Sequence, residues 1–116
     1  MGTLSEAGKT TELKDGMMKD VLVQHHEILL ARIGDSYYAT DNRCPHMRGR
    51  LSDGKLDVTI VTCPKHSSQF DIRSGEVIRW LKGSDLLSRV SRIFKSPKRL
   101  LTYAVIVKGD NIFIEI

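Results

Sequence analysis

The amino-acid sequence predicts an all-β fold. Its apolar residues gather in short runs rich in β-branched side chains, and turn-forming residues separate these runs. The chain of 116 residues has the usual size of one domain and can bury a core without disulfide bonds. We therefore expect one antiparallel domain over residues 13–116, preceded by a flexible N-terminus over residues 1–12.

Strand composition recurs along the whole chain after the N-terminus. The alternation of apolar and other residues is clearest in Leu101–Val107, whose odd-numbered positions are apolar. Turn signals such as Asp53-Gly54 and Ser74-Gly75 punctuate the pattern. The predicted strands are Val21–Gln24, Ile28–Ile33, Tyr37–Thr40, Val58–Thr62, Gln69–Ile72, Val77–Trp80, Leu101–Val107 and Ile112–Ile116.

The N-terminal residues predict neither a strand nor a targeting signal. Met1–Thr11 is small and polar without periodicity, which is typical of a frayed terminus. It lacks the apolar stretch of a signal peptide, and no run in the chain reaches the roughly 18 apolar residues of a membrane span. We expect a cytoplasmic protein with no membrane span.

One stretch predicts a short amphipathic helix, Ser84–Lys95, because its apolar residues recur at helical spacing and Pro97 ends it. The segment from Arg79 to Arg99 holds seven basic residues and one acidic residue, whereas 11 basic and 13 acidic residues lie elsewhere. This local concentration argues against nucleic-acid binding as the cause of the net charge of +4. Two interpretations remain open: the basic face is only solvated, or it docks an acidic partner or a membrane surface.

Four residues form a pattern suited to metal binding: Cys44, His46, Cys63 and His66. The chain has two cysteines, so a disulfide framework is not expected, and paired Cys and His indicate metal ligands. Each half of the pattern pairs one thiolate with one imidazole, whereas zinc sites usually keep a close pair of cysteines. The mixed pairs favour a two-metal cluster. The alternative is a zinc-stabilised protein-interaction module.

The segments around these residues, Cys44–Leu51 and Cys63–Asp71, resemble the two motifs of Rieske [2Fe–2S] proteins. The similarity extends from about Val21 to the last strands. It implies an antiparallel β-sandwich or barrel with two cluster-binding loops at one tip, and one [2Fe–2S] cluster per chain.

The resemblance also implies how the ligands are shared. Cys44 and Cys63 would hold one iron, and His46 and His66 the other. Neutral imidazoles raise the reduction potential of such a cluster above that of an all-cysteine cluster.

The sequence departs from the family at two positions where glycine is usual, Arg48 and Ser67, and we expect these residues to strain the loops. Respiratory members have a cysteine in each motif that forms an inter-loop disulfide. Gly49 and Lys65 occupy those positions, so the resemblance is to the soluble ferredoxin branch.

Four residues would flank the cluster: Met47, Lys65, Ser68 and Phe70. In high-potential members, serine and tyrosine hydroxyls from the second loop donate hydrogen bonds toward the cluster. Ser68 retains the first donor and Phe70 lacks the second, so we expect a low potential within the family.

The resemblance implies a one-electron carrier and not an enzyme. Its donor would be a flavoprotein or ferredoxin reductase, and its acceptor an oxygenase or another redox protein. We expect no role for His25 and His26 beyond a hairpin tip, and we expect Trp80 and Tyr103 to contribute to packing rather than to an electron path.

Overall fold

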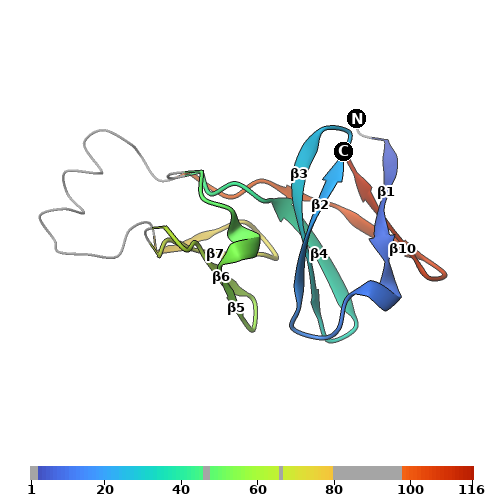
Figure 1. The fold of residues 1–116 in the computed structure, drawn as a ribbon, viewed down its shortest axis with the longest axis horizontal. Helices are drawn as coiled ribbons and strands as arrows, with labels where there is room; N and C mark the ends of the chain where they lie inside the picture. The colour runs from blue at the N-terminus through green and yellow to red at the C-terminus, as the bar shows by residue number, and fades with distance from the viewer. Residues whose placement is uncertain (1–2, 46–47, 66, 80–97) are drawn as a thin grey trace, which may run out of the picture.

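The computed structural model describes residues 3–45, 48–65, 67–79 and 98–116 and confirms the all-β fold. Among these residues the strands form three antiparallel sheets. Two sheets build a base, and the third lies beside the cysteine loops, on the side of the molecule opposite β1 and β10 (Figure 1). The predicted helix Ser84–Lys95 and Trp80 lie outside the described residues.

The first base sheet has the order β1-β11-β10. Its strands are Leu4–Lys9 for β1, Val105–Lys108 for β10 and Asn111–Glu115 for β11. The prediction of a flexible N-terminus is wrong, because β1 pairs along its length with β11 and is followed by a short 3-10 helix, Thr10–Glu12. Only Ala7 of β1 is buried, so the strand is held by long-range pairing rather than by an apolar pattern of its own.

The second base sheet has the order β2-β3-β4-β9, and its strand β3 lies between two cores. Its strands are Met18–Val23, His26–Ile33, Ser36–Asp41 and Thr102–Tyr103. Leu29 and Ala31 of β3 belong to the core that contains both cysteines, whereas Ile28 and Leu30 belong to the core beneath β11. The continuous apolar run of β3 is explained by burial on both faces.

The third sheet has the order β5-β6-β7-β8. Its strands are Lys55–Asp57, Ile60–Thr62, Gln69–Asp71 and Val77–Arg79. The sequence predicted one strand over Val58–Thr62, but Val58 and Thr59 form the turn between β5 and β6. Val58 has a φ of 54° and is 74% exposed, so its β-branched side chain here marks a turn and not a strand. The 3-10 helix Leu51–Asp53 precedes this sheet.

The predicted strand Leu101–Val107 is divided at Ala104, because the chain changes sheets there. β9 pairs with β4, and β10 pairs with β11. Tyr103 packs against the base core, as expected, and its hydroxyl donates a 2.6 Å hydrogen bond to Asp41 Oδ1. Burial and this contact raise the pKa of Tyr103 above its ordinary value.

The turn between β7 and β8 contacts Leu100, which precedes β9 of the base. Gly75 has a φ of 78°, and any Cβ there would overlap the carbonyl of Leu100, whose amide donates to Gly75 O at 2.8 Å. Asp71 accepts hydrogen bonds from the backbone and side chain of Arg73, and these hold the pKa of Asp71 below its ordinary value. Substitutions at Gly75 or Asp71 would therefore disrupt this turn.

Candidate metal centre

The first cysteine loop is closed by two backbone hydrogen bonds. The amide of Cys44 donates to Gly49 O at 2.8 Å, and the amide of Arg48 donates to Cys44 O at 2.7 Å. Arg48 has a φ of 57°, in the left-handed region. The loop is thus a tight turn that begins at the cysteine and ends five residues later.

The second cysteine loop repeats this pattern. The amide of Cys63 donates to Ser68 O at 2.8 Å, the amide of Ser67 donates to Cys63 O at 3.0 Å, and Ser67 has a φ of 61°. Two separate segments of the chain therefore fold into the same turn, each with a cysteine at its start. This is the arrangement expected of two loops that share one bound group.

The two departures from the family pattern lie at equivalent left-handed positions of these turns. Glycine adopts this conformation freely, whereas Arg48 and Ser67 carry a Cβ that costs roughly 1–2 kcal/mol each. The expectation of strain at these positions is therefore confirmed. The turns close despite it.

The loops meet at Gly49 of the first loop and the second cysteine. A Cβ added to Gly49 would lie 2.8 Å from Cys63 Sγ and 3.0 Å from Lys65 Cγ. Gly49 is buried, so the absence of a side chain there lets the first loop approach the second sulfur closely. Sequence reasoning considered Gly49 only as a substituted cysteine and missed this contact.

Cys44 and Cys63 form no disulfide; each is 1% exposed and lies within the core that also holds Leu51 and Phe70. Where both bind as thiolates, the metal neutralises charge that would otherwise be costly in this apolar core. The donor chemistry fits the thiolate half of an iron–sulfur cluster. The other two predicted ligands, His46 and His66, lie outside the described residues, as does Met47.

The flanking residues that the structure describes differ in their surroundings. Ser68 and Phe70 are both fully buried, and Ser68 closes the second loop through its carbonyl. Lys65 is exposed, and its side-chain carbons lie near Gly49. Phe70 thus shares a core with Cys63, and Ser68 is hydrogen-bonded to the backbone of Cys63.

A buried asparagine fixes the base of the first loop. Asn42 is 1% exposed, and its side chain exchanges two hydrogen bonds with Ser52, of 2.9 and 2.8 Å. Its backbone amide donates to Glu27 O, and its carbonyl accepts from Leu51 N. Nothing in the composition around Asn42 distinguishes it from an ordinary turn residue, so the sequence alone did not indicate it.

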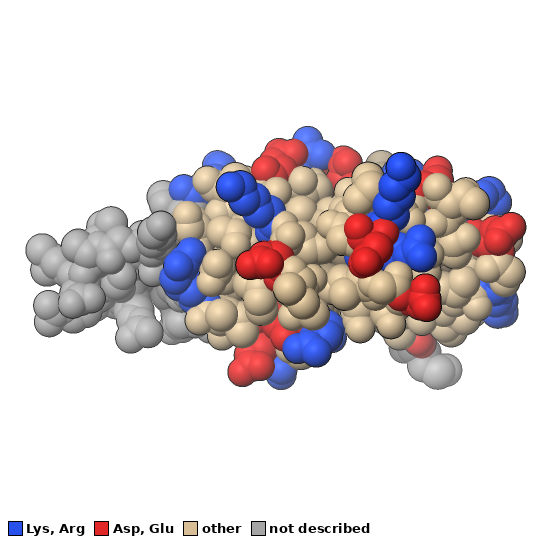
Figure 2. Space-filling model, turned by 90° about the horizontal axis from the view of Figure 1, so that it is seen from below, with Lys and Arg blue, Asp and Glu red and all other residues tan. Residues whose placement is uncertain are grey.

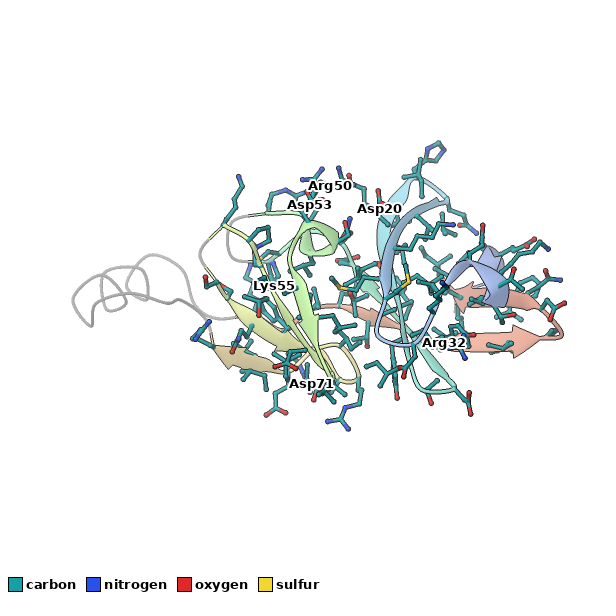
Figure 3. All side chains as sticks on the ribbon, turned by 60° about the horizontal axis from the view of Figure 1, so that its bottom comes forward. Asp20, Arg32, Arg50, Asp53, Lys55 and Asp71 are labelled. Atoms are coloured by element: carbon teal, nitrogen blue, oxygen red, sulfur yellow. The ribbon has the colours of Figure 1, made fainter. Side chains whose placement is uncertain are left out.

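Two ion pairs tie the first loop to the base. Arg43 forms a two-point contact with Glu27 of β3, with distances of 2.6 and 2.9 Å. This contact lowers the pKa of Glu27 and raises that of Arg43. Arg50 reaches Asp20 of β2 at 2.6 Å, and Figure 3 shows it between Asp20 and Asp53.

The histidines without an expected ligand role lie at the hairpin between β2 and β3. His25 has a φ of 68° in the turn, and His26 begins β3, which confirms the expected hairpin. Both line a hollow of about 530 Å³ beside Cys44, together with Arg43 and residues 98–101. Nothing in the sequence indicated that these histidines lie near Cys44.

The fold and the paired cysteine turns define a β protein built to hold a metal cluster between two loops. The model of the Rieske [2Fe–2S] domain matches residues 3–88. The chain is 30% identical over 105 residues to the ferredoxin component of the naphthalene 1,2-dioxygenase system of Pseudomonas aeruginosa, covering 90% of this chain and 88% of that protein. It is 33% identical over 90 residues to the 3-phenylpropionate/cinnamic acid dioxygenase ferredoxin subunit of Shigella flexneri, covering 77% and 72%.

A solved structure agrees with these relatives. The ferredoxin of carbazole 1,9a-dioxygenase from Nocardioides aromaticivorans IC177 superimposes with a TM-score of 0.80 at 25% identity, covering 97% of both chains. The chain belongs to the Rieske [2Fe–2S] domain family. It is an electron carrier with a [2Fe–2S] cluster and not an enzyme. The family match therefore favours the carrier over the alternative, a zinc-stabilised protein-interaction module. In the part of the chain that the structure describes, no helix is long and apolar enough to cross a membrane.

Proposed function

We propose that this chain is the electron-carrying component of an oxygenase system, and that Cys44 and Cys63 ligate one iron of its cluster and His46 and His66 the other. The single observation that carries the ligand assignment is the repeated turn, in which each cysteine begins a loop that holds one of the two histidines. The bound cluster supplies one-electron chemistry.

The chain's own residues protect the thiolate side of that site. The apolar core around Cys44 and Cys63 excludes water, and Gly49 brings the two loops together. A buried cysteine pair does not face a partner, so the proposed histidine ligands supply the side through which an electron leaves.

The names of the relatives support the partner proposal, because they are ferredoxin parts of dioxygenase systems. We propose a flavoprotein or ferredoxin reductase as the donor, an oxygenase or another redox protein as the acceptor, and a cytoplasmic location. On the face seen in Figure 2, acidic and basic side chains are interspersed, which does not resemble the basic stripe of a nucleic-acid-binding protein.

Metal analysis and histidine replacement test the proposal. Purified protein should contain two irons and two acid-labile sulfides per chain, and His46→Ala and His66→Ala should lose the cluster. His25→Ala and His26→Ala are matched controls from the hairpin and should keep its visible spectrum. Equal effects at all four histidines would contradict the assignment.

Reconstitution tests the partners. The protein should carry electrons from a purified flavoprotein reductase to a Rieske oxygenase, with a rate that depends on its concentration. Iron-loaded protein that accepts no electron from any such reductase would contradict the donor proposal while leaving the ligand assignment intact.

A further inference from the structure

Each of the two strained residues of the cysteine loops has its carbonyl oxygen held by an arginine. Arg43 Nη1 donates to Arg48 O at 3.2 Å, and Arg79 Nε donates to Ser67 O at 3.1 Å. The two arginines come from different places, since Arg43 directly precedes the first loop and Arg79 ends β8. They nevertheless contact the equivalent position of each turn.

We propose that Arg43 and Arg79 are positioning residues that hold the two cluster loops in their left-handed conformation where other members of the family rely on glycine. The proposal rests on the cluster site described above. It concerns the two arginines, whose side chains act through the loop backbone and are not ligands.

A physical reason connects the arginine to the strain. A residue with a Cβ relaxes from the left-handed region whenever the loop permits it. Such a relaxation would rotate the peptide that follows Arg48 or Ser67 and would move its carbonyl away from the guanidinium. A hydrogen bond from a charged donor opposes that rotation and is stronger than one between neutral groups.

The two arginines are anchored in different ways. Two carboxylate oxygens of Glu27 hold Arg43, and Glu27 lies on the buried strand β3. The backbone of Arg79 pairs with Gln69 of β7. Each arginine therefore connects a cysteine loop to a strand of a sheet.

The peptide held by each arginine also bears on the cluster's electronic properties. Because a trans peptide is planar, fixing the carbonyl of Ser67 fixes the direction of the Ser68 amide, which lies in the second cysteine loop. Amide dipoles beside a cluster contribute to its reduction potential. Removal of either arginine should therefore change the potential as well as the stability of the site.

The chain offers a matched control in Arg32. Its Nε donates to Gly34 O at 2.8 Å, and Gly34 also has a positive φ, of 61°. Arg32 lies on the base, away from the third sheet (Figure 3). The same kind of arginine contact to a left-handed residue is thus present where no cluster is held.

The test measures iron release from the holoprotein to a chelator, together with the reduction potential of each variant. Arg79→Ala should speed iron release by about tenfold and Arg43→Ala by somewhat less, since the Arg43 contact is longer and more exposed. Arg79→Lys should give an intermediate rate. Arg32→Ala should leave both the release rate and the potential unchanged.

Glycine rescue separates positioning from general destabilisation. In the Arg79→Ala background, Ser67→Gly should reduce the acceleration to about two- to threefold, because glycine needs no support in this conformation. Arg48→Gly in that background should slow release only by the factor that it gives in the wild type, whereas it should rescue Arg43→Ala more strongly. If Arg79→Ala does not fold, Ser67→Gly alone in the wild type should still slow iron release.

Two results would overturn the proposal: release rates for Arg79→Ala equal to those of Arg32→Ala, or equal rescue by the matched and the mismatched glycine. These outcomes are distinguishable from failure of the proposed function. A wild-type protein without iron would refute the cluster assignment, whereas an iron-loaded wild type with unresponsive arginine variants would refute only the positioning role.

Discussion

Replacement of Gly49 by alanine tests the contact between the two cysteine loops. The added Cβ would lie 2.8 Å from Cys63 Sγ, whereas comfortable non-bonded contacts begin near 3.5 Å. The sulfur or the first loop must therefore move by about 0.7 Å. The hydrogen bonds that close both loops resist such a movement, and overpacking of this kind costs about 1–3 kcal/mol.

We expect this cost to fall on cluster binding, because one of the displaced atoms is a proposed ligand. A cost of about 1–3 kcal/mol corresponds to roughly 5- to 150-fold faster iron release to a chelator. The measurement follows the visible absorbance of the holoprotein after chelator is added. Gly8→Ala is the matched control, because an added Cβ there meets mainly the carboxylate at the end of the Glu12 side chain, at 3.0 Å, and no cysteine. Release rates that are equal for Gly49→Ala, Gly8→Ala and wild type would refute the close approach of the loops.

Four further substitutions test other parts of the account. The wild-type reduction potential should lie in the lower half of the roughly −150 to +300 mV Rieske range. Ser68→Ala should lower this potential and Phe70→Tyr should raise it. Voltammetry that shows no response to either substitution would mean that these buried residues do not face the cluster. Asp71 has a depressed pKa, so its contact with Arg73 stabilises the folded state above the unfolded pKa near 4 and is lost as pH falls through the folded value. Urea unfolding at pH 7 and below pH 4 should therefore show a smaller loss of stability on acidification for Asp71→Asn than for wild type, and equal losses would contradict this. His25→Gly should raise the free energy of unfolding by about 1 kcal/mol, because the turn needs a positive φ there, and a lower stability would contradict it.

The strands with strong apolar patterns could be predicted from the sequence. The run over β3 and the alternation of Ile112 and Ile114 in β11 reflect burial, which composition reveals directly. β1 was missed because it has one buried residue and depends on pairing with β11, at the other end of the chain. The turn at Val58 was missed because a valine with a positive φ contradicts its own propensity.

In the candidate site too, some residues could be predicted from the sequence and others could not. Cys44 and Cys63 were predicted because ligand types and spacing are local properties of the sequence. Asn42, Gly49 and Arg79 were not, since their roles depend on contacts with residues that the fold brings close. The left-handed positions of the two cysteine loops could be predicted only from the resemblance, which identified Arg48 and Ser67 as residues that replace glycine.

Pulsed electron paramagnetic resonance of the reduced protein tests the central claim most directly. Mixed ligation places two imidazole nitrogens on the reducible iron, so the spectrum of the reduced [2Fe–2S] cluster should show hyperfine couplings to two nitrogens of this kind, in a protein with two irons and two sulfides per chain. A colourless protein with one zinc, or a cluster signal without imidazole couplings, would contradict the account.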